Sequence, residues 1–103
     1  MSPITTHVLN TAEGRPAAGV AVTLEFSGEI IAQGTTDQDG RIRDLLADGH
    51  QLRPGAYRIT FDTAKHSPFY PRIDVTFIIE DTSEHYHIPL LLSPFGYSTY
   101  RGS

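Results

Sequence analysis

Apolar and polar side chains alternate along most of the chain, and no window of about twelve residues carries the apolar stripe of a helix. The alternation is clearest over residues 20–26, 57–61 and 73–79. In each segment β-branched and aromatic residues recur at every second position, which gives a strand one apolar face. These segments are therefore predicted to be β-strands that pack one face on a core.

Turn-forming residues separate the alternating segments at short intervals. Asp39-Gly40 has the composition of a tight hairpin turn whose backbone needs positive φ. Further turns are predicted at Glu13-Gly14-Arg15-Pro16, Ser27-Gly28-Glu29, Arg53-Pro54-Gly55 and Ser67-Pro68. About seven or eight short strands with turns roughly every 8–12 residues are typical of an all-β, two-sheet antiparallel sandwich. The length of 103 residues suits a single domain over 1–103 and is too short for two.

The composition excludes several classes of function. The net charge of −4 lacks the basic surface that nucleic-acid binding needs. The strongest apolar stretch, residues 88–92, is far too short to span a bilayer, and no basic amphipathic segment suits a membrane surface. The absence of cysteine rules out disulfides, thiolate zinc sites and a cysteine nucleophile. No signal peptide is visible at the N-terminus, so we expect a cytoplasmic protein.

Two of the five histidines fall on the outer face of a predicted strand. In the first strand the apolar face is formed by the even-numbered residues from 4 to 8, so His7 points away from the core. In the last strand the even-numbered residues from 86 to 92 form that face, and His87 points outward. The same outer faces carry Leu9, Pro89 and Leu91. A surface of histidine and apolar side chains indicates a buried interface or a ligand groove, although ordinary surface histidines beside stray leucines give the same pattern.

Arg41 follows the Asp39-Gly40 turn and alternates with Ile42, so it is expected to leave the core face together with Arg43. Its guanidinium donors suit a planar, oxygen-bearing ligand. A solvated arginine beside a turn is the simpler alternative.

Three apparent motifs lack a residue that their function requires. His85 and His87 could chelate a metal from one strand face, but no third ligand is nominated, so no metal site is predicted. Residues 37–40 imitate part of a calcium loop, yet Leu46 stands where a bidentate glutamate belongs. Residues 96–100 lack the second glycine of a serine-hydrolase elbow.

Three segments together resemble the 5-hydroxyisourate hydrolase family, also called transthyretin-related proteins. They are Thr6-His7-Val8-Leu9-Asn10-Thr11 with its continuation to Val20, Thr36 to Arg41, and His87 to Ser103. The first segment is the least specific, because unrelated sandwich domains share its Gly-x-Pro…Gly-Val-x-Val part. The most specific feature is His-x-Pro-Leu-Leu-Leu-Ser-Pro joined to the closing Tyr-Arg-Gly-Ser. The resemblance spans the chain from end to end.

The resemblance implies a transthyretin-like sandwich that assembles as a homotetramer, a dimer of dimers with active sites in the channel between dimers. It implies hydrolytic opening of the six-membered ring of 5-hydroxyisourate to 2-oxo-4-hydroxy-4-carboxy-5-ureidoimidazoline in urate degradation, with a small purine-derived substrate and no cofactor. The family's catalytic residues fall on His7, Arg41 and His87. The tetrapeptide that lines the family's site falls on Tyr100, Arg101, Gly102 and Ser103.

Two other functions fit a transthyretin-like fold. The first is a non-catalytic carrier of small ligands, whose channel in transthyretin is lined by uncharged and aliphatic groups together with lysine. The second is an accessory β-sandwich module, which has no reason to keep the Tyr-Arg-Gly-Ser terminus. The chain also departs from its relatives between Asp62 and Pro71, where they often carry a longer loop or a brief helix. Residues 63–66 leave room for at most one helical turn.

Overall fold

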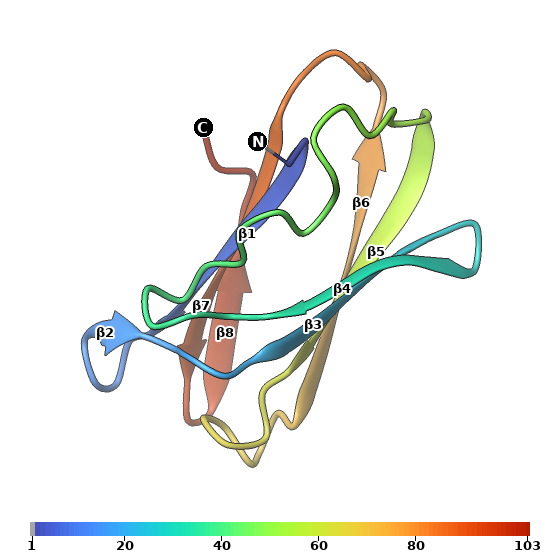
Figure 1. Cartoon of the computed structure of the whole chain (residues 1–103). Coiled ribbons are helices and arrows are strands. Elements are labelled where there is room, and N and C mark those ends of the chain that lie inside the picture. The colour runs from blue at the N-terminus through green and yellow to red at the C-terminus, as the bar shows by residue number, and fades with distance from the viewer. Residues whose placement is uncertain (1) are drawn as a thin grey trace.

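The computed structural model describes residues 2–103, which form two four-stranded sheets and no helix (Figure 1). The strands are β1 (Ile4–Asn10), β2 (Arg15–Pro16), β3 (Ala21–Phe26), β4 (Glu29–Thr35), β5 (Gly55–Asp62), β6 (Arg72–Ile79), β7 (Tyr86–Ser93) and β8 (Gly96–Thr99). Their order is β2-β1-β7-β8 in one sheet and β4-β3-β5-β6 in the other. The described chain contains no helix of the length and apolar character needed to cross a membrane.

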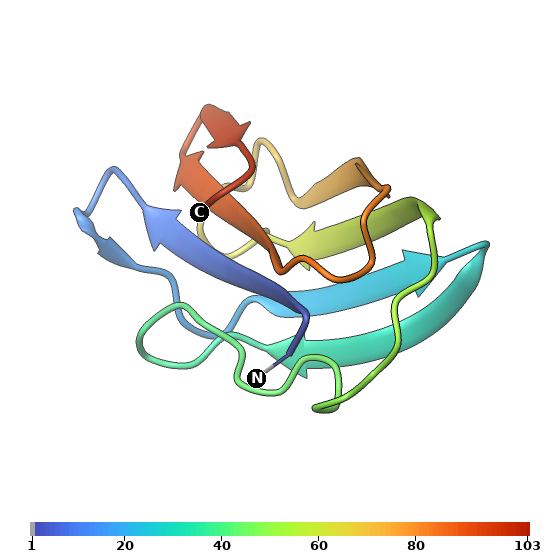
Figure 2. The ribbon, with the colours of Figure 1, turned by 90° about the horizontal axis from the view of Figure 1, so that it is seen from above.

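The core lies between the two sheets, which Figure 2 shows as two layers seen from above. Burial along β1 alternates strictly, with the even-numbered residues from 4 to 10 buried and the odd-numbered ones half-buried. This is the period of two that the sequence predicts, and burying each large aliphatic side chain contributes roughly 1.5–3 kcal/mol. The largest fully buried side chains are Tyr57, Phe61, Ile4, Leu24, Ile59 and Ile73. The predicted sandwich is therefore confirmed.

One strand pair runs parallel, whereas the other pairs described are antiparallel. The first and last long strands, β1 and β7, pair in parallel with Thr5 opposite His87 and His7 opposite Pro89. Parallel neighbours need a long crossover connection, and here the whole second sheet lies between them in sequence. The pairing places the outward side chains of the two chain ends side by side.

The segment between β4 and β5 carries the predicted turn at Asp39-Gly40. Gly40 has φ 74°, and its carbonyl accepts a 2.8 Å hydrogen bond from the Val8 backbone N–H. A Cβ on Gly40 would collide with the Val8 carbonyl oxygen, so only glycine fits this close approach. The turn thereby holds Arg41 in a bridge opposite His7 on β1.

The shortened segment between β5 and β6 forms a single hydrogen-bonded turn. The backbone N–H groups of His66 and Ser67 both donate to the Thr63 carbonyl, at 3.0 and 2.8 Å. This agrees with the expectation of at most one turn over residues 63–66.

Candidate functional site

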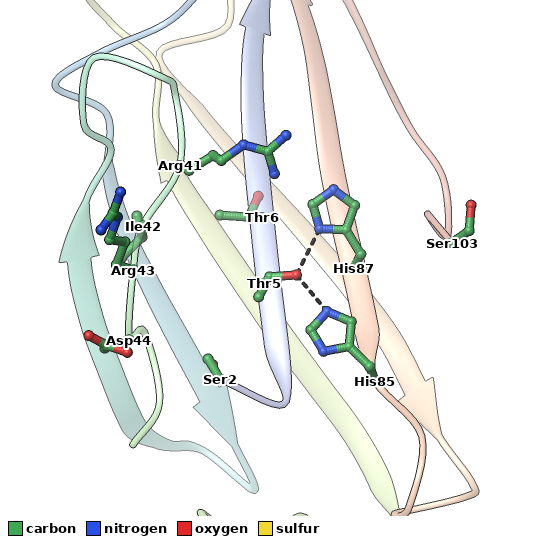
Figure 3. A pocket seen from close by; sticks show the side chains of 10 residues that line it. All are labelled: Ser2, Thr5, Thr6, Arg41, Ile42, Arg43, Asp44, His85, His87 and Ser103. Atoms are coloured by element: carbon green, nitrogen blue, oxygen red, sulfur yellow. Dashed lines mark hydrogen bonds between the residues drawn. The ribbon is translucent and has the colours of Figure 1, made fainter. Parts of the chain in front are cut away.

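An open cavity of about 780 Å³ lies on the outer face of the β1–β7 pair. Figure 3 shows that its side chains come from β1, from the segment after the Gly40 turn, from the start of β7 and from the chain terminus. Of the residues nominated from the sequence, the cavity is lined by Arg41, His87 and Ser103. Two segments that are far apart in sequence thus contribute to one site because β1 and β7 are neighbours.

His87 lies half-buried on β7, one strand in from the sheet edge that β8 forms. Its Nδ1 is 2.8 Å from the Thr5 hydroxyl. Burial lowers the pKa of His87 below its ordinary value of 6.5, and the positive charge of Arg41 and the neighbouring His7 and His85 lower it further. The ring is therefore neutral at pH 7 and can accept a proton.

His7 lies half-buried on β1 and is anchored to the turn that carries Arg41. Its Nε2 is 2.8 Å from the backbone carbonyl oxygen of Asp39. A carbonyl only accepts hydrogen bonds, so Nε2 carries the hydrogen and the neutral ring keeps a lone pair on Nδ1. In the parallel register Thr5 lies opposite His87, and His7 follows two residues further along β1. Two residues of a strand span about 7 Å.

Arg41 is exposed, and hydrogen bonds fix its backbone. The Asp37 carboxylate accepts hydrogen bonds from the Arg41 and Asp39 backbone N–H groups, at 3.1 and 2.8 Å. The bond from Arg41 is the main reason that the pKa of Asp37 is lowered. Within residues 2–103 the Arg41 guanidinium makes no hydrogen bond or ion pair, and Figure 3 shows it extending across β1. Its donors are available to a ligand.

The C-terminal tetrapeptide is held against His87 by its backbone. The Gly102 N–H donates to the His87 carbonyl at 2.8 Å. A Cβ on Gly102 would lie only 2.5 Å from Cδ2 of the His87 ring. Arg101 stacks over the Tyr86 ring at 4.4 Å and lies 3.6 Å from the Glu84 carboxylate. These contacts bring Ser103 to the cavity.

The nominated residues are not all brought to one place. Tyr100 and Arg101 line a separate depression over β6 and β7, and His7 and Gly102 lie beside the main cavity rather than among the side chains that line it. Leu9 and Leu91 are half-buried on the outer face, as predicted. Pro89 is instead buried, with His7 of β1 opposite it and Thr99 of β8 bonded to its carbonyl.

The model of the HIUase/Transthyretin family matches residues 4–102. The chain belongs to this family. It is 46% identical, over 98% of its length, to the uric acid degradation bifunctional protein TTL of Arabidopsis thaliana, of which it spans only 37%. It is 44% identical, over 97% of its length, to the 5-hydroxyisourate hydrolase of Salmonella typhimurium, of which it spans 80%.

Solved structures of the HIUase/Transthyretin family share the sandwich. The 5-hydroxyisourate hydrolase of Klebsiella pneumoniae superposes with a TM-score of 0.85 at 36% identity, covering 97% of this chain and 98% of that one. Sea bream transthyretin, solved in complex with thyroxine, has a TM-score of 0.86 at 32% identity, covering 98% and 95%. The family recognised in the sequence is confirmed, and so is the prediction of an enzyme, because curated relatives that match nearly the whole chain are 5-hydroxyisourate hydrolases.

Thr5 and His85 are among the residues of this site that were not nominated as catalytic or binding residues from the sequence. Thr5 and His85 line the cavity, and the Thr5 hydroxyl contacts both His85 and His87. Strand parity already put Thr5 on the same face as His7, but only the parallel β1–β7 pairing shows that it meets the histidines. No group of three or more His, Cys, Asp or Glu side chains in residues 2–103 is arranged to hold a metal ion.

Proposed function

We propose that the protein opens the six-membered ring of 5-hydroxyisourate by hydrolysis and yields 2-oxo-4-hydroxy-4-carboxy-5-ureidoimidazoline. The names of its relatives support the broader assignment, a hydrolase of urate degradation. The observation that carries the proposal is the convergence of a neutral histidine, His87, and the guanidinium of Arg41, which has no ion-pair partner among residues 2–103, on one open cavity with His7 beside it. Ring opening needs a base for water and a donor for a carbonyl oxygen, and this pair supplies both.

His87 is the better base for water. Its lowered pKa keeps the ring unprotonated, and the nitrogen that does not face Thr5 is available to the cavity. A positioned base of this kind contributes roughly 10²–10⁴-fold in rate. In the proposed step His87 takes a proton from water, the hydroxide oxygen bonds to the ring carbonyl carbon, and the carbon–nitrogen bond then breaks. The departing ring nitrogen takes up this proton, either from His87 directly or from His7 after Nδ1 of His7 has accepted it.

Arg41 acts on the charge that develops during the attack. Its guanidinium presents several N–H donors to an anionic purine-like ring or to the oxyanion formed at the carbonyl. One well-placed donor of this kind is worth about 10²–10³-fold in rate. The Asp37 carboxylate and the close packing of Gly40 on β1 fix the backbone from which Arg41 extends.

The terminal residues divide into two roles in this proposal. Ser103, which lines the cavity, is proposed to contact the substrate. Tyr100, Arg101 and Gly102 hold the terminus in place, since Gly102 is bonded to His87 and Arg101 packs on Tyr86.

The oligomeric state, the cellular location and the partners remain predictions from the sequence and the family resemblance. The half-buried Leu9 and Leu91 and the open cavity on the same sheet support a homotetramer in which a partner covers this face. A single domain over 1–103, a cytoplasmic location, the absence of a cofactor and the lack of nucleic-acid or membrane partners belong to the same proposal.

A ligand carrier is the second candidate, favoured by the close structural similarity to a transthyretin solved with thyroxine. The ultraviolet decay of 5-hydroxyisourate, generated from urate by urate oxidase, separates the two. An enzyme accelerates the decay at catalytic concentrations and gives the expected product. A carrier binds without acceleration, and that result would exclude the hydrolase.

A further inference from the structure

The Thr5 hydroxyl connects the candidate base to a second histidine that reaches solvent. Its Oγ1 is 2.8 Å from Nδ1 of His87 and 2.8 Å from Nε2 of His85, as the dashed lines in Figure 3 show. Thr5 lies opposite His87 in the parallel register, and its β-branched side chain has restricted χ1 freedom. His85 is exposed, whereas His87 is half-buried. An unbroken hydrogen-bonded chain therefore runs from half-buried His87 through Thr5 to exposed His85.

The number of hydrogens in this chain limits how it can be arranged. A hydroxyl has one hydrogen, so Thr5 can donate to only one of the two rings and accept from the other. When His87 donates from Nδ1 to Thr5, and Thr5 donates to His85, Nε2 of His87 keeps its lone pair for water. In this arrangement, unlike the reverse one in which Thr5 donates to His87, His87 is the tautomer that can act as a base.

The surroundings of His87 make it costly to leave a positive charge there. Arg41 approaches from the segment after the Gly40 turn, His7 lies on β1 and His85 precedes β7, and all three disfavour an imidazolium. Asp44 is the carboxylate side chain that lines the same cavity in the described chain, together with the terminal Ser103. If His87 accepts a proton on Nε2 and loses its other proton from Nδ1, the ring avoids this unfavourable positive charge.

We propose that Thr5 and His85 are positioning residues that relay the Nδ1 proton of His87 to solvent while its Nε2 accepts a proton from water. The proposal rests on the proposed function. In the step, the Nδ1–H proton of His87 passes to Thr5 Oγ1, and the Thr5 hydroxyl proton passes to Nε2 of His85. His85 then releases a proton from Nδ1 to water. When Nε2 of His87 gives its proton to the departing ring nitrogen, the chain runs in reverse and restores Nδ1–H.

Three variants separate a relay from a structural role. Thr5→Val keeps the shape and the β-propensity but lacks the hydroxyl, and it should lower kcat by at least about tenfold with little change in KM. Thr5→Ser keeps the hydroxyl and should stay within about threefold of the wild type. His85→Ala should lose kcat similarly and regain it with rising imidazole concentration. Thr76→Val, at an exposed position on β6, is the matched control and should behave as the wild type.

Nitrogen-15 NMR of the His87 ring tests the same chain without turnover. The wild type should show one dominant tautomer with the hydrogen on Nδ1, and Thr5→Val should show a mixture or the other tautomer. If the wild type does not accelerate 5-hydroxyisourate decay, the proposed function fails whatever the NMR shows. If the wild type is active, any of three results overturns the relay: unchanged kcat in Thr5→Val, a loss confined to KM, or a His85→Ala defect that imidazole does not relieve.

Discussion

Replacing Gly102 by alanine tests whether the chain terminus and His87 are mechanically coupled. The added Cβ would lie 2.5 Å from Cδ2, 3.2 Å from Cγ and 3.3 Å from Cβ of His87. Ordinary van der Waals contact begins at 3.4 Å, so the terminus and the ring must separate by about 0.9 Å. The shift also strains the 2.8 Å hydrogen bond from the Gly102 N–H to the His87 carbonyl.

A displacement of about 1 Å in a positioned group can lower the rate by about a hundredfold. We therefore expect Gly102→Ala to reduce kcat/KM for 5-hydroxyisourate by between tenfold and a hundredfold, on the order of that estimate. The protein should stay folded with its melting temperature lowered by about 10 °C at most, because losing one half-buried hydrogen bond costs about 0.5–1.5 kcal/mol. The assay is ultraviolet decay of the substrate, with the melting temperature measured in parallel.

Gly96→Ala is the matched control for this variant. Its added Cβ would meet Ser93 Oγ at 3.5 Å, an ordinary contact, so activity should stay near that of the wild type. Wild-type kcat/KM in Gly102→Ala would refute the coupling of the terminus to His87. Equal losses in both variants would show that the effect is a general perturbation of β8 and the tail.

Three more predictions follow from the same geometry. Burial and the nearby Arg41, His7 and His85 lower the pKa of His87, so its neutral form persists as the pH falls and the acid limb of kcat/KM should lie below pH 6.5. Arg41→Met should cut kcat/KM by about 10²–10³-fold and should also move that acid limb to higher pH. Gly40→Ala should lower the melting temperature by more than about 5 °C, since positive φ alone costs roughly 1–2 kcal/mol and the added Cβ meets the Val8 carbonyl. Gly49→Ala, at φ 77° in open space, should lower it less, and equal melting temperatures for the two variants would contradict the steric clash at Gly40. A tag after Ser103 should impair turnover more than a tag before the first residue, and equal activities would place the terminus outside the site.

The alternation of side chains was sufficient to place the histidines. The outward direction of His7 and His87 follows from the period of two, because every residue of a strand faces opposite to its neighbours. The turn at Gly40 was also predictable from the sequence, since its positive φ requires a residue such as glycine. Both are local properties, which depend on a few consecutive residues.

Strand pairing is not local, and the features that depend on it were missed. The parallel alignment of β1 with β7 joins residues more than eighty positions apart and creates the Thr5 contacts with both rings. The burial of Pro89 depends on its neighbours on β1 and β8, which parity alone does not reveal. The close fit of Gly102 against His87 likewise depends on where the chain terminus folds back.

The roles of His7 and His87 in hydrolysis are tested by comparing 5-hydroxyisourate decay with the wild type, His7→Asn, His87→Asn and the control His50→Asn. His50 is exposed in the segment before β5, outside the residues that line the cavity. We expect decay well above the spontaneous rate with the wild type and His50→Asn, and at least about a hundredfold lower turnover in each of the other two variants. Near-normal turnover in both His7→Asn and His87→Asn would contradict this expectation.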